Sequence, residues 1–324
     1  MNFYPLKFAP IFKEMIWGGT ALRENLGKAT TSNKVGESWE LSGVPDNVSM
    51  IGNGEYAGYS LDKLIALSPE QILGKTNVTR TGIAFPLLIK FIDACDDLSI
   101  QVHPNDEQAK SLGSAGKTEM WYILNAQPNA TLISGFSQPL SSEQYANCVK
   151  NNTLESVLQK HPVARGDVFF IPAGRVHAIG KGIVLLEIQQ SSNITYRIFD
   201  YNRRDANGNP RQLHTEQAMQ VIDYKVYPDY KTHYTASSNV PSVLAQCPYF
   251  TTNLLKINKL KTRDYAHLDS FVIYICTQGS AKIEYGQGKS ETISLGETVL
   301  LPAAIKSASL VPQGEAEVVE VYVE

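Results

Sequence analysis

Cysteine is scarce in this chain of 324 residues, and the four cysteines that it has show no paired spacing. Cys95, Cys148, Cys247 and Cys276 stand far apart, and none of them belongs to a C-x-x-C pair. This spacing argues against a disulfide framework and against a metal site built from thiolates. We therefore expect buried free thiols in a reducing compartment.

Long apolar runs and an excess of positive charge are missing as well. No stretch approaches the roughly 20 apolar residues that a membrane-spanning helix requires. The N-terminal sequence MNFYPLKFAPIFKEMIWGG has neither the basic nor the apolar segment of a signal peptide. The 29 Lys and Arg residues are outnumbered by 32 Asp and Glu residues, which argues against nucleic acid as a partner. We expect a cytoplasmic protein that binds neither membrane nor nucleic acid.

The sequence is rich, by contrast, in short β-prone segments that are mostly separated by Gly, Pro, Asn or Ser. They lie at 86–93, 98–102, 119–124, 167–172, 182–189, 270–276, 281–285, 297–302 and 317–323. This pattern is typical of an all-β sandwich or barrel. Helical patterns are fewer, and they cover 60–74 and 141–161.

The chain also repeats itself. GDVFFIPA at 166–173 has a counterpart in GETVLLPA at 296–303, and Gln127 matches Gln278 upstream. The matched glutamine precedes the matched glycine by 39 positions in the first copy and by 18 in the second, so the first copy carries an insertion of 21 residues. We expect a first domain over 1–235, with a helical insertion at about 137–162, and a second domain over 240–324.

The repeated unit resembles the cupin, a jelly-roll barrel. The motif G-x5-P-x-G-x2-H is matched by Gly166, Pro172, Gly174 and His177. Glycine suits a tight turn and proline ends a strand, so His177 follows a fixed bend and faces the mouth of the barrel. The expected fold is all-β, with two cupin domains and a small helical insertion in the first.

Four polar side chains of the first copy could meet inside its barrel: Gln101, His103, Glu119 and His177. Gln101 and His103 stand two residues apart in LSIQVHPND, so strand alternation sends both to one face. Two imidazoles, a carboxylate and an amide oxygen suit one divalent ion per chain, such as Zn²⁺.

The second copy has Ser270 and Ser307 at the places that we assign to Glu119 and His177, so we expect it to be metal-free. The alternative for a single buried histidine is a hydrogen-bonded core residue, and for Gln101 alone that alternative is the stronger one. The remaining histidines have no comparable setting, and we expect them to be structural or exposed: His161, His214, His233 and His267.

Six segments in order resemble the type I mannose-6-phosphate isomerases, in particular the short bacterial form. They are IWGGTAL (16–22), VGESWELSG (35–43), PLLIKFIDACDDLSIQVHPND (86–106), GKTEMWYIL (116–124), FIPAGRVHAIG (170–180) and LLEIQQSSNITYRIFDYNR (185–203). The resemblance implies a zinc-dependent aldose–ketose isomerase that interconverts D-mannose 6-phosphate and D-fructose 6-phosphate through an enediol. It also implies that Gln101, His103, Glu119 and His177 are the metal ligands.

The same resemblance places the family's essential arginine at Arg197 and the lysine before the glutamate ligand at Lys117. A permanently charged guanidinium suits the developing charge of an enediol. Lys117 could carry a proton only if burial or a neighbouring cation favours its neutral amine; otherwise it is a phosphate anchor or a surface lysine. Asn193 stands where the family usually has an aspartate that is proposed to assist ring opening, and an amide cannot take up that proton.

Four further residues are candidate substrate contacts: Trp17, Glu40, Lys90 and Ser99. The resemblance places Trp17 and Glu40 near the sugar pocket, although a core aromatic and an exposed strand charge or cap are the alternatives. Lys90, inside the apolar run PLLIK, requires a buried partner or a place in the pocket. Ser99, Lys110 and Lys117 are candidates for the phosphate.

Two other functions remain possible from the sequence. One is a catalytically silent sugar-phosphate-binding cupin, against which the retention of Arg197 and Lys117 argues. The other is a metal-dependent cupin oxygenase, which typically requires iron and a two-histidine facial triad; the amide ligand Gln101 argues against it. The sequence does not indicate an oligomeric state.

Overall fold

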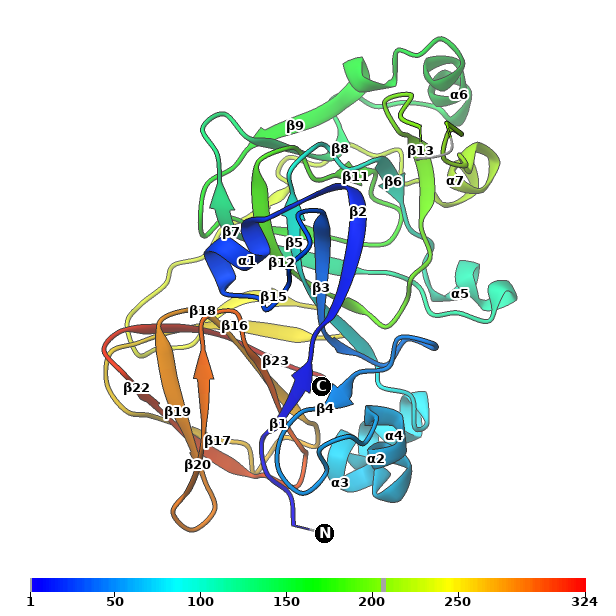
Figure 1. The fold of residues 1–324 in the computed structure, drawn as a ribbon. Helices are drawn as coiled ribbons and strands as arrows, with labels where there is room; N and C mark the ends of the chain where they lie inside the picture. Colours follow the sequence, from blue (N-terminus) through cyan, green and yellow to red (C-terminus); the bar gives the residue numbers. More distant parts are fainter. Residues whose placement is uncertain (1, 205–207) are drawn as a thin grey trace.

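The computed structural model describes residues 2–204 and 208–324 (Figure 1). Strands account for 40% of it and helices for 16%, and the strands form four antiparallel sheets. The expected all-β fold with little helix is therefore confirmed. None of the helices in the described part of the chain is long and apolar enough to cross a membrane. All four cysteines are free, but Cys276 alone is buried and Cys95 is exposed, so the expectation of buried thiols was wrong for most of them.

The N-terminal barrel is built from a sheet of seven strands and a sheet of five. The larger sheet has the order β14 (Lys231–Thr232), β10 (Val168–Ile171), β7 (Glu119–Ala126), β12 (Ile183–Gln190), β5 (Leu87–Ala94), β3 (Val35–Ser42) and β2 (Ile11–Gly19). The smaller sheet has the order β13 (Tyr196–Phe199), β6 (Ile100–Val102), β11 (His177–Ala178), β8 (Thr131–Phe136) and β9 (Leu158–Pro162). Trp121 and Phe169 of the larger sheet pack with Leu132 of the smaller one, so the sheets enclose a common interior.

The C-terminal barrel repeats this plan. Its larger sheet has the order β15 (Ser242–Gln246), β16 (Thr251–Ile257), β23 (Ala316–Tyr322), β18 (Val272–Gln278), β21 (Thr298–Leu301), β1 (Leu6–Ala9) and β4 (Met50–Ile51). Its smaller sheet has the order β17 (Lys261–Asp264), β22 (Ser307–Pro312), β19 (Ser280–Tyr285) and β20 (Lys289–Ser294). Tyr274 and Val299 pack against Ile283 and Leu310 between the two sheets.

Matching hydrogen bonds bear out the internal repeat. The backbone N–H of Gly166 donates to the carbonyl oxygen of Ile123 at 2.9 Å, and that of Gly296 donates to the carbonyl of Cys276 at 2.9 Å. Both glycines have a positive φ, of 89° and 80°, which a residue with a Cβ rarely adopts. Ile123 and Cys276 are therefore equivalent positions in the two copies.

The pairing registers of the two repeats correct the expected counterpart of Glu119 in the second copy. Glu119 pairs with Ile171 across β7 and β10, and the equivalent of Ile171, which is Leu301, pairs with Val272 across β18 and β21. The counterpart of Glu119 is thus Val272, and its assignment to Ser270 was wrong. The two glutamines on which the sequence match rested lie at different distances from the hairpin, which shifted the register by two residues.

The helices are short. They are α1 (Ala21–Leu26), α2 (Leu61–Leu67), α3 (Pro69–Leu73), α4 (Lys75–Thr81), α5 (Asp106–Ala109), α6 (Ser142–Lys150) and α7 (Thr215–Val221), with 3₁₀ turns η1 (Lys110–Leu112) and η2 (Leu154–Val157). The helix expected over 60–74 is divided because Pro69 begins a new helix at its first position. The insertion at about 137–162 contains α6, η2 and then the strand β9, so its helix is shorter than expected.

The N-terminal segment joins the two barrels. Strand β1 pairs with β21 through Leu6 and Leu300, and α3 contacts the C-terminal barrel where Ala303 donates to the carbonyl of Ile72 at 3.0 Å. Phe91 and Phe271, one from each barrel, belong to a single apolar cluster. The domain division near 235–240 stays a prediction, but β1 and β4 lie in the larger sheet of the C-terminal barrel.

Candidate active site

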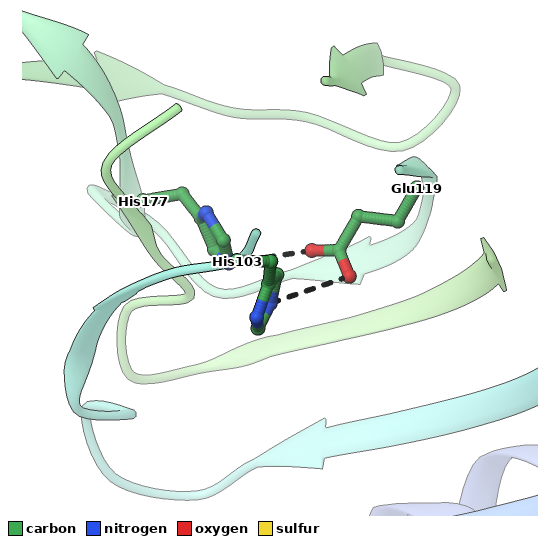
Figure 2. A group of neighbouring side chains, drawn as sticks. All are labelled: His103, Glu119 and His177. Carbon is green, nitrogen blue, oxygen red and sulfur yellow. Dashed lines mark ion pairs between the residues drawn. The ribbon is translucent and has the colours of Figure 1, made fainter. Parts of the chain in front are cut away.

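Three strands of the N-terminal barrel bring His103, Glu119 and His177 together. His103 follows the last residue of β6, Glu119 is the first residue of β7, and His177 is the first residue of β11. One potential ligand atom from each lies within 4.8 Å of the others, and all three side chains are buried. Figure 2 shows the Glu119 carboxylate pointing toward both imidazoles. The convergence predicted for these three residues is therefore confirmed.

The distances within this His–Glu–His group are short. Glu119 Oε1 lies 3.3 Å from His177 Nε2, and Glu119 Oε2 lies 3.7 Å from His103 Nε2. The Lys117 ammonium donates to Glu119 Oε2 at 2.5 Å and lies 3.0 Å from His103 Nε2. A cation thus already sits against the ligand atoms that face one another.

The hydrogen bonds of His177 show that the group fits a metal ion. His177 Nδ1 donates to the backbone carbonyl of Arg175 at 2.8 Å, so Nε2 carries a lone pair. Among the described residues neither His177 Nε2 nor Glu119 Oε1 has a hydrogen-bond partner. Two buried acceptors that face each other without a donor are costly, and a cation between them removes that cost. Nitrogen and carboxylate ligands suit a divalent ion such as Zn²⁺.

The protonation states agree with this fit. Burial, together with the charge of Lys117, lowers the pKa of His177 to about 3 and that of His103 well below its usual value. Both imidazoles are therefore neutral, as metal ligands must be. Burial, reinforced by the nearby Glu187 carboxylate, raises the pKa of Glu119 to about 7. A cation bound beside this carboxylate would favour its charged form.

Gln101 is the fourth expected ligand. Its Cα is paired with that of His177 across β6 and β11, and its half-buried side chain lines the cavity described next. Its role as a ligand stays a prediction. In the C-terminal barrel, Val272 is buried at the place of Glu119, and Ser307 is exposed at the start of β22, as His177 starts β11.

A cavity of about 320 Å³ opens beside the His–Glu–His group. Of the residues predicted from the sequence, it is lined by Trp17, Lys90, Ser99, Gln101, Lys117 and Arg197, and also by Asn193. These residues come from segments up to 180 positions apart in the sequence. The structure therefore gathers both predicted catalytic residues and three of the four predicted substrate contacts around one space.

Sequence reasoning missed two carboxylates of the cavity wall, Glu37 and Glu187. Glu187 Oε1 lies 3.0 Å from Lys90 Nζ, and Glu37 Oε2 lies 3.7 Å from the same nitrogen. Burial alone would lower the pKa of Lys90, but the two carboxylates outweigh it and raise that pKa. Glu187 stands inside the apolar run GIVLLEIQ just as Lys90 stands inside PLLIK. The presence of one charged residue in each of two apolar runs was the signal available in the sequence, because a charged residue in a buried strand requires a partner of opposite charge.

Glu40 is placed differently from what we expected. It is absent from the described cavity wall, and its carboxylate pairs with Lys28 Nζ at 2.6 Å and accepts from Ser38 at 2.5 Å. Burial raises its pKa. Lys28 also donates to the carbonyl of Gly296 in the C-terminal barrel. The Glu40 side chain therefore belongs to the contact between the barrels, and Glu37 of the same strand is the one that reaches the cavity.

Arg197 lies on β13, where its Cα is paired with that of Gln101 on β6. Its Nη1 donates to the carbonyl of Gln212 at 2.9 Å, while its Nε is buried and has no partner among the described residues. A third residue that the sequence did not indicate, Arg211, lines the same cavity. Lys110, one of the candidates for the phosphate, is exposed on η1 and is not part of the described wall.

Two cupin-type barrels, one with a buried His–Glu–His group beside a charged cavity, define a cupin-type protein that can hold a metal ion. A model of the family "phosphomannose isomerase type I, catalytic domain" matches residues 6–136. The mannose-6-phosphate isomerase ManA of Bacillus subtilis is 36% identical to this chain over 321 residues, which are 98% of each protein. The chain belongs to the type I phosphomannose isomerase family.

Other comparisons agree with this membership. The mannose-6-phosphate isomerase of Streptococcus mutans is 35% identical over 306 residues, 94% of each chain. The crystal structure of the mannose 6-phosphate isomerase from Bacillus subtilis superposes with a TM-score of 0.87 at 32% identity, over 98% of this chain and 99% of that one. A variant of the phosphomannose isomerase from Salmonella typhimurium, at 18% identity and a TM-score of 0.81 over 98% and 99% of the chains, shares the fold.

Proposed function

We propose that this chain is a mannose-6-phosphate isomerase, which interconverts D-mannose 6-phosphate and D-fructose 6-phosphate with zinc as its metal. The observation that carries the proposal is the pair of unpartnered buried acceptors, His177 Nε2 and Glu119 Oε1, beside a cavity lined by cations. Two relatives that are named mannose-6-phosphate isomerases match nearly the whole chain. A cytoplasmic location, expected from the sequence, stays a prediction.

The reaction moves a proton from C2 of the aldose to C1, and a proton from the C2 hydroxyl to the C1 oxygen, through an enediolate that carries negative charge. His103, Glu119 and His177, with Gln101 as the proposed fourth ligand, would hold the metal. A bound divalent ion supplies Lewis-acid polarisation of the sugar oxygens. Nitrogen and oxygen ligands without thiolate are compatible with zinc, and the redox-inert ion suits a reaction without net oxidation.

Arg197 provides the permanent positive charge for the enediol. The pairing of its Cα with that of Gln101, the proposed fourth ligand, supports this role. Its Nη1 bond to the carbonyl of Gln212 fixes the guanidinium before substrate arrives. A preorganised cation costs no rearrangement at the moment when charge develops, which is why such groups contribute strongly to catalysis.

The two lysines of the cavity have different environments. Lys90 is held between Glu187 and Glu37, which keep it charged, so it can orient sugar hydroxyls but cannot accept a proton. Lys117 lines the cavity two residues before Glu119 and contacts no carboxylate other than that one among the described residues. Lys117 is therefore the residue that we propose to move the proton between C2 and C1.

The remaining wall orients the sugar. Trp17 is almost fully buried and presents an apolar surface to the cavity, as sugar-ring contacts commonly require. Asn193 lines the same space, but an amide cannot take up the proton released on ring opening. Ring opening in this enzyme therefore depends on other groups or on water.

Removal of the metal tests the proposed function directly. We expect turnover of mannose 6-phosphate, measured as fructose 6-phosphate formed, to disappear after exhaustive chelation and to return on addition of one equivalent of zinc. Addition of magnesium is the control, because it prefers an all-oxygen octahedral site and should not restore turnover. Turnover that survives complete metal removal contradicts the proposal. Sugar-phosphate binding without turnover would indicate a silent binding protein, and metal-dependent oxygen consumption would indicate an oxygenase.

The support behind His177 gives a second, milder prediction. The Arg175 carbonyl fixes the tautomer of His177, and the Arg175 guanidinium lies against the rings of Tyr227 and Tyr230, at 4.7 and 4.6 Å from their centroids. We expect Arg175→Ala to weaken zinc binding by roughly 10-fold, as loss of such outer supports commonly does. Competition with a chromophoric chelator measures this change. Lys181→Ala, at an exposed position nearby, is the control, and equal affinities of the two variants contradict the prediction.

A further inference from the structure

The charged residues in the cavity wall and next to it fall into two groups. Beside the His–Glu–His group, Lys90 and Lys117 face the carboxylates Glu37, Glu119 and Glu187. The second group consists of three arginines around a single carboxylate: Arg197, Arg203, Arg211 and Asp200. The first group has more negative than positive side chains and suits a metal cation, whereas the second has an excess of positive charge and suits an anion.

The Asp200 carboxylate accepts hydrogen bonds from two of these arginines. Arg211 donates from Nε to Asp200 Oδ2 at 2.7 Å and from Nη2 to Asp200 Oδ1 at 2.5 Å. Arg203 donates from Nη2 to Oδ1 at 2.6 Å, and its other donors bind the backbone carbonyls of Asp200 and Asp97. The Asp200 side chain is buried, so this bidentate pairing fixes the plane of the Arg211 guanidinium.

Arg203 and Arg211 differ in the number of guanidinium donors that remain free to bind a ligand. Arg203 uses each of its three nitrogens within the fold and is not part of the described cavity wall. Arg211 lines the cavity, and its Nη1 has no partner among the described residues. The edge of Arg211 that Asp200 leaves uncovered is therefore available to the cavity.

Strand register places these groups in a row. Ser99, Gln101 and His103 alternate onto one side of the segment that contains β6, and β13 runs antiparallel to it with Arg197 opposite Gln101. The last residue of β13, Phe199, pairs with Ile100, and Asp200 follows it, so the chain leads away from His103 and toward the Ser99 end of the segment. The row from His103 to Ser99 is about 13 Å long at the usual rise per residue. An open-chain sugar phosphate that places C1 and C2 near the metal can therefore direct its far end toward Ser99 and Arg211.

Two further observations favour an anion there. The Arg211 charge, after burial itself, contributes to lowering the pKa of Arg197, so the two guanidiniums repel each other across the cavity. The Asp200 carboxylate, which acts to raise the pKa of Arg197, offsets part of this repulsion. Ser99, which also lines the cavity, is buried and offers a hydroxyl as a further donor.

We propose that Arg211, with Ser99, binds the phosphate of the substrate, and that Asp200 is the positioning residue that presents Arg211 to the cavity; this inference rests on the proposed function. A sugar phosphate carries close to two negative charges at neutral pH, and a guanidinium edge matches two phosphate oxygens. Arg197 then remains for the enediol. Lys90 is excluded from this role because its carboxylate partners neutralise it.

The test compares Arg211→Gln with Arg204→Gln, a control at an exposed arginine whose Nη1 bonds within its own loop. For Arg211→Gln we expect the KM for mannose 6-phosphate and the inhibition constant of inorganic phosphate each to rise about 10- to 100-fold, the usual loss for charge-assisted hydrogen bonds. Turnover at saturation and zinc content should stay within about threefold of wild type, because phosphate binding is equal in ground and transition states. Arg204→Gln should match wild type.

Asp200→Asn tests the positioning role, since it keeps the shape of the side chain and removes the charge that holds Arg211. We expect the same two constants to rise, by less than in Arg211→Gln, with turnover retained. Arg211→Lys keeps a cation and should recover part of the phosphate inhibition. This second variant keeps the inference testable if Arg211→Gln does not fold. Unchanged constants in Arg211→Gln, or a fall in turnover at constant KM, overturn the inference. A wild-type enzyme that does not isomerise mannose 6-phosphate overturns the proposed function instead.

Discussion

His177→Ala is expected to lose bound zinc and at least about 1,000-fold in turnover of mannose 6-phosphate, because the several kcal/mol of Lewis-acid stabilisation disappear with the metal. His177 is fully buried and directs Nε2 toward Glu119. Its position at the start of β11 fixes that direction, so a neighbouring side chain cannot take its place. The loss should therefore persist when zinc is added in excess.

Thermal unfolding gives a readout that does not depend on activity. Zinc that binds only the folded state stabilises it by mass action, so the wild-type midpoint should rise with zinc concentration while that of His177→Ala should not. His161→Ala is the matched control, because His161 is half-buried in the same barrel but bonds the backbone of Ser134. It should keep its zinc response. A zinc-dependent rise in His177→Ala equal to that of wild type would contradict the assignment of the metal group.

The metal group could be predicted from the sequence because each of its members has a local signal. Gln101 and His103 are fixed on one face by strand alternation, and His177 is fixed by the glycine and proline that precede it in the cupin motif. Their convergence with Glu119 then required only the barrel. The expectation held for His103 and His177 because short-range geometry, rather than long-range register, determines which way they point, whereas the ligand role of Gln101 stays a prediction.

The pairing register between neighbouring strands explains which contacts of the site could not be predicted from the sequence. Glu187 and Lys90 meet because β12 and β5 pair residue by residue, which no local pattern specifies. On β3 a register shift between Trp39 and Leu41 breaks simple alternation, so whether Glu37 or Glu40 faces the cavity could not be decided from the sequence. Arg211 lines the cavity and is held by Asp200, and a pairing of this kind between two residues outside regular strands has no sequence signature.

The contacts that join the two barrels are a further feature that no local sequence pattern predicts. β1 precedes the N-terminal barrel in the chain but pairs with β21 of the C-terminal barrel, so the larger sheet of the C-terminal barrel contains residues from both sides of the predicted division at 235–240. Lys28 makes a similar connection, since it pairs with Glu40 and donates to the Gly296 carbonyl. The C-terminal barrel therefore supports strand β3, which carries Glu37 to the cavity.

Arg197→Gln is expected to lower turnover by about 100- to 1,000-fold, the range seen when one preorganised group that stabilises transition-state charge is removed. The side chain is fixed by the Gln212 carbonyl and stands opposite Gln101 on the neighbouring strand. Because it does not belong to the His–Glu–His group, zinc content should remain at the wild-type level. Loss of turnover with retained zinc separates its role from that of His177.

Arg197→Lys sharpens this test, since it keeps a positive charge and removes the planar fork. If charge alone stabilises the enediol, Arg197→Lys should recover most of the turnover lost in Arg197→Gln; if paired hydrogen bonds are needed, it should recover little. We expect the second result. The Nη1 group of Arg197 donates to the Gln212 carbonyl, which leaves the other nitrogens of the guanidinium for the substrate. The single ammonium group of a lysine cannot reach both that carbonyl and the substrate in the same geometry. Steady-state turnover of mannose 6-phosphate with zinc analysis on the same samples decides between the two. Near wild-type turnover in Arg197→Gln would remove Arg197 from the mechanism and return the stabilisation of the enediol to the metal and the lysines.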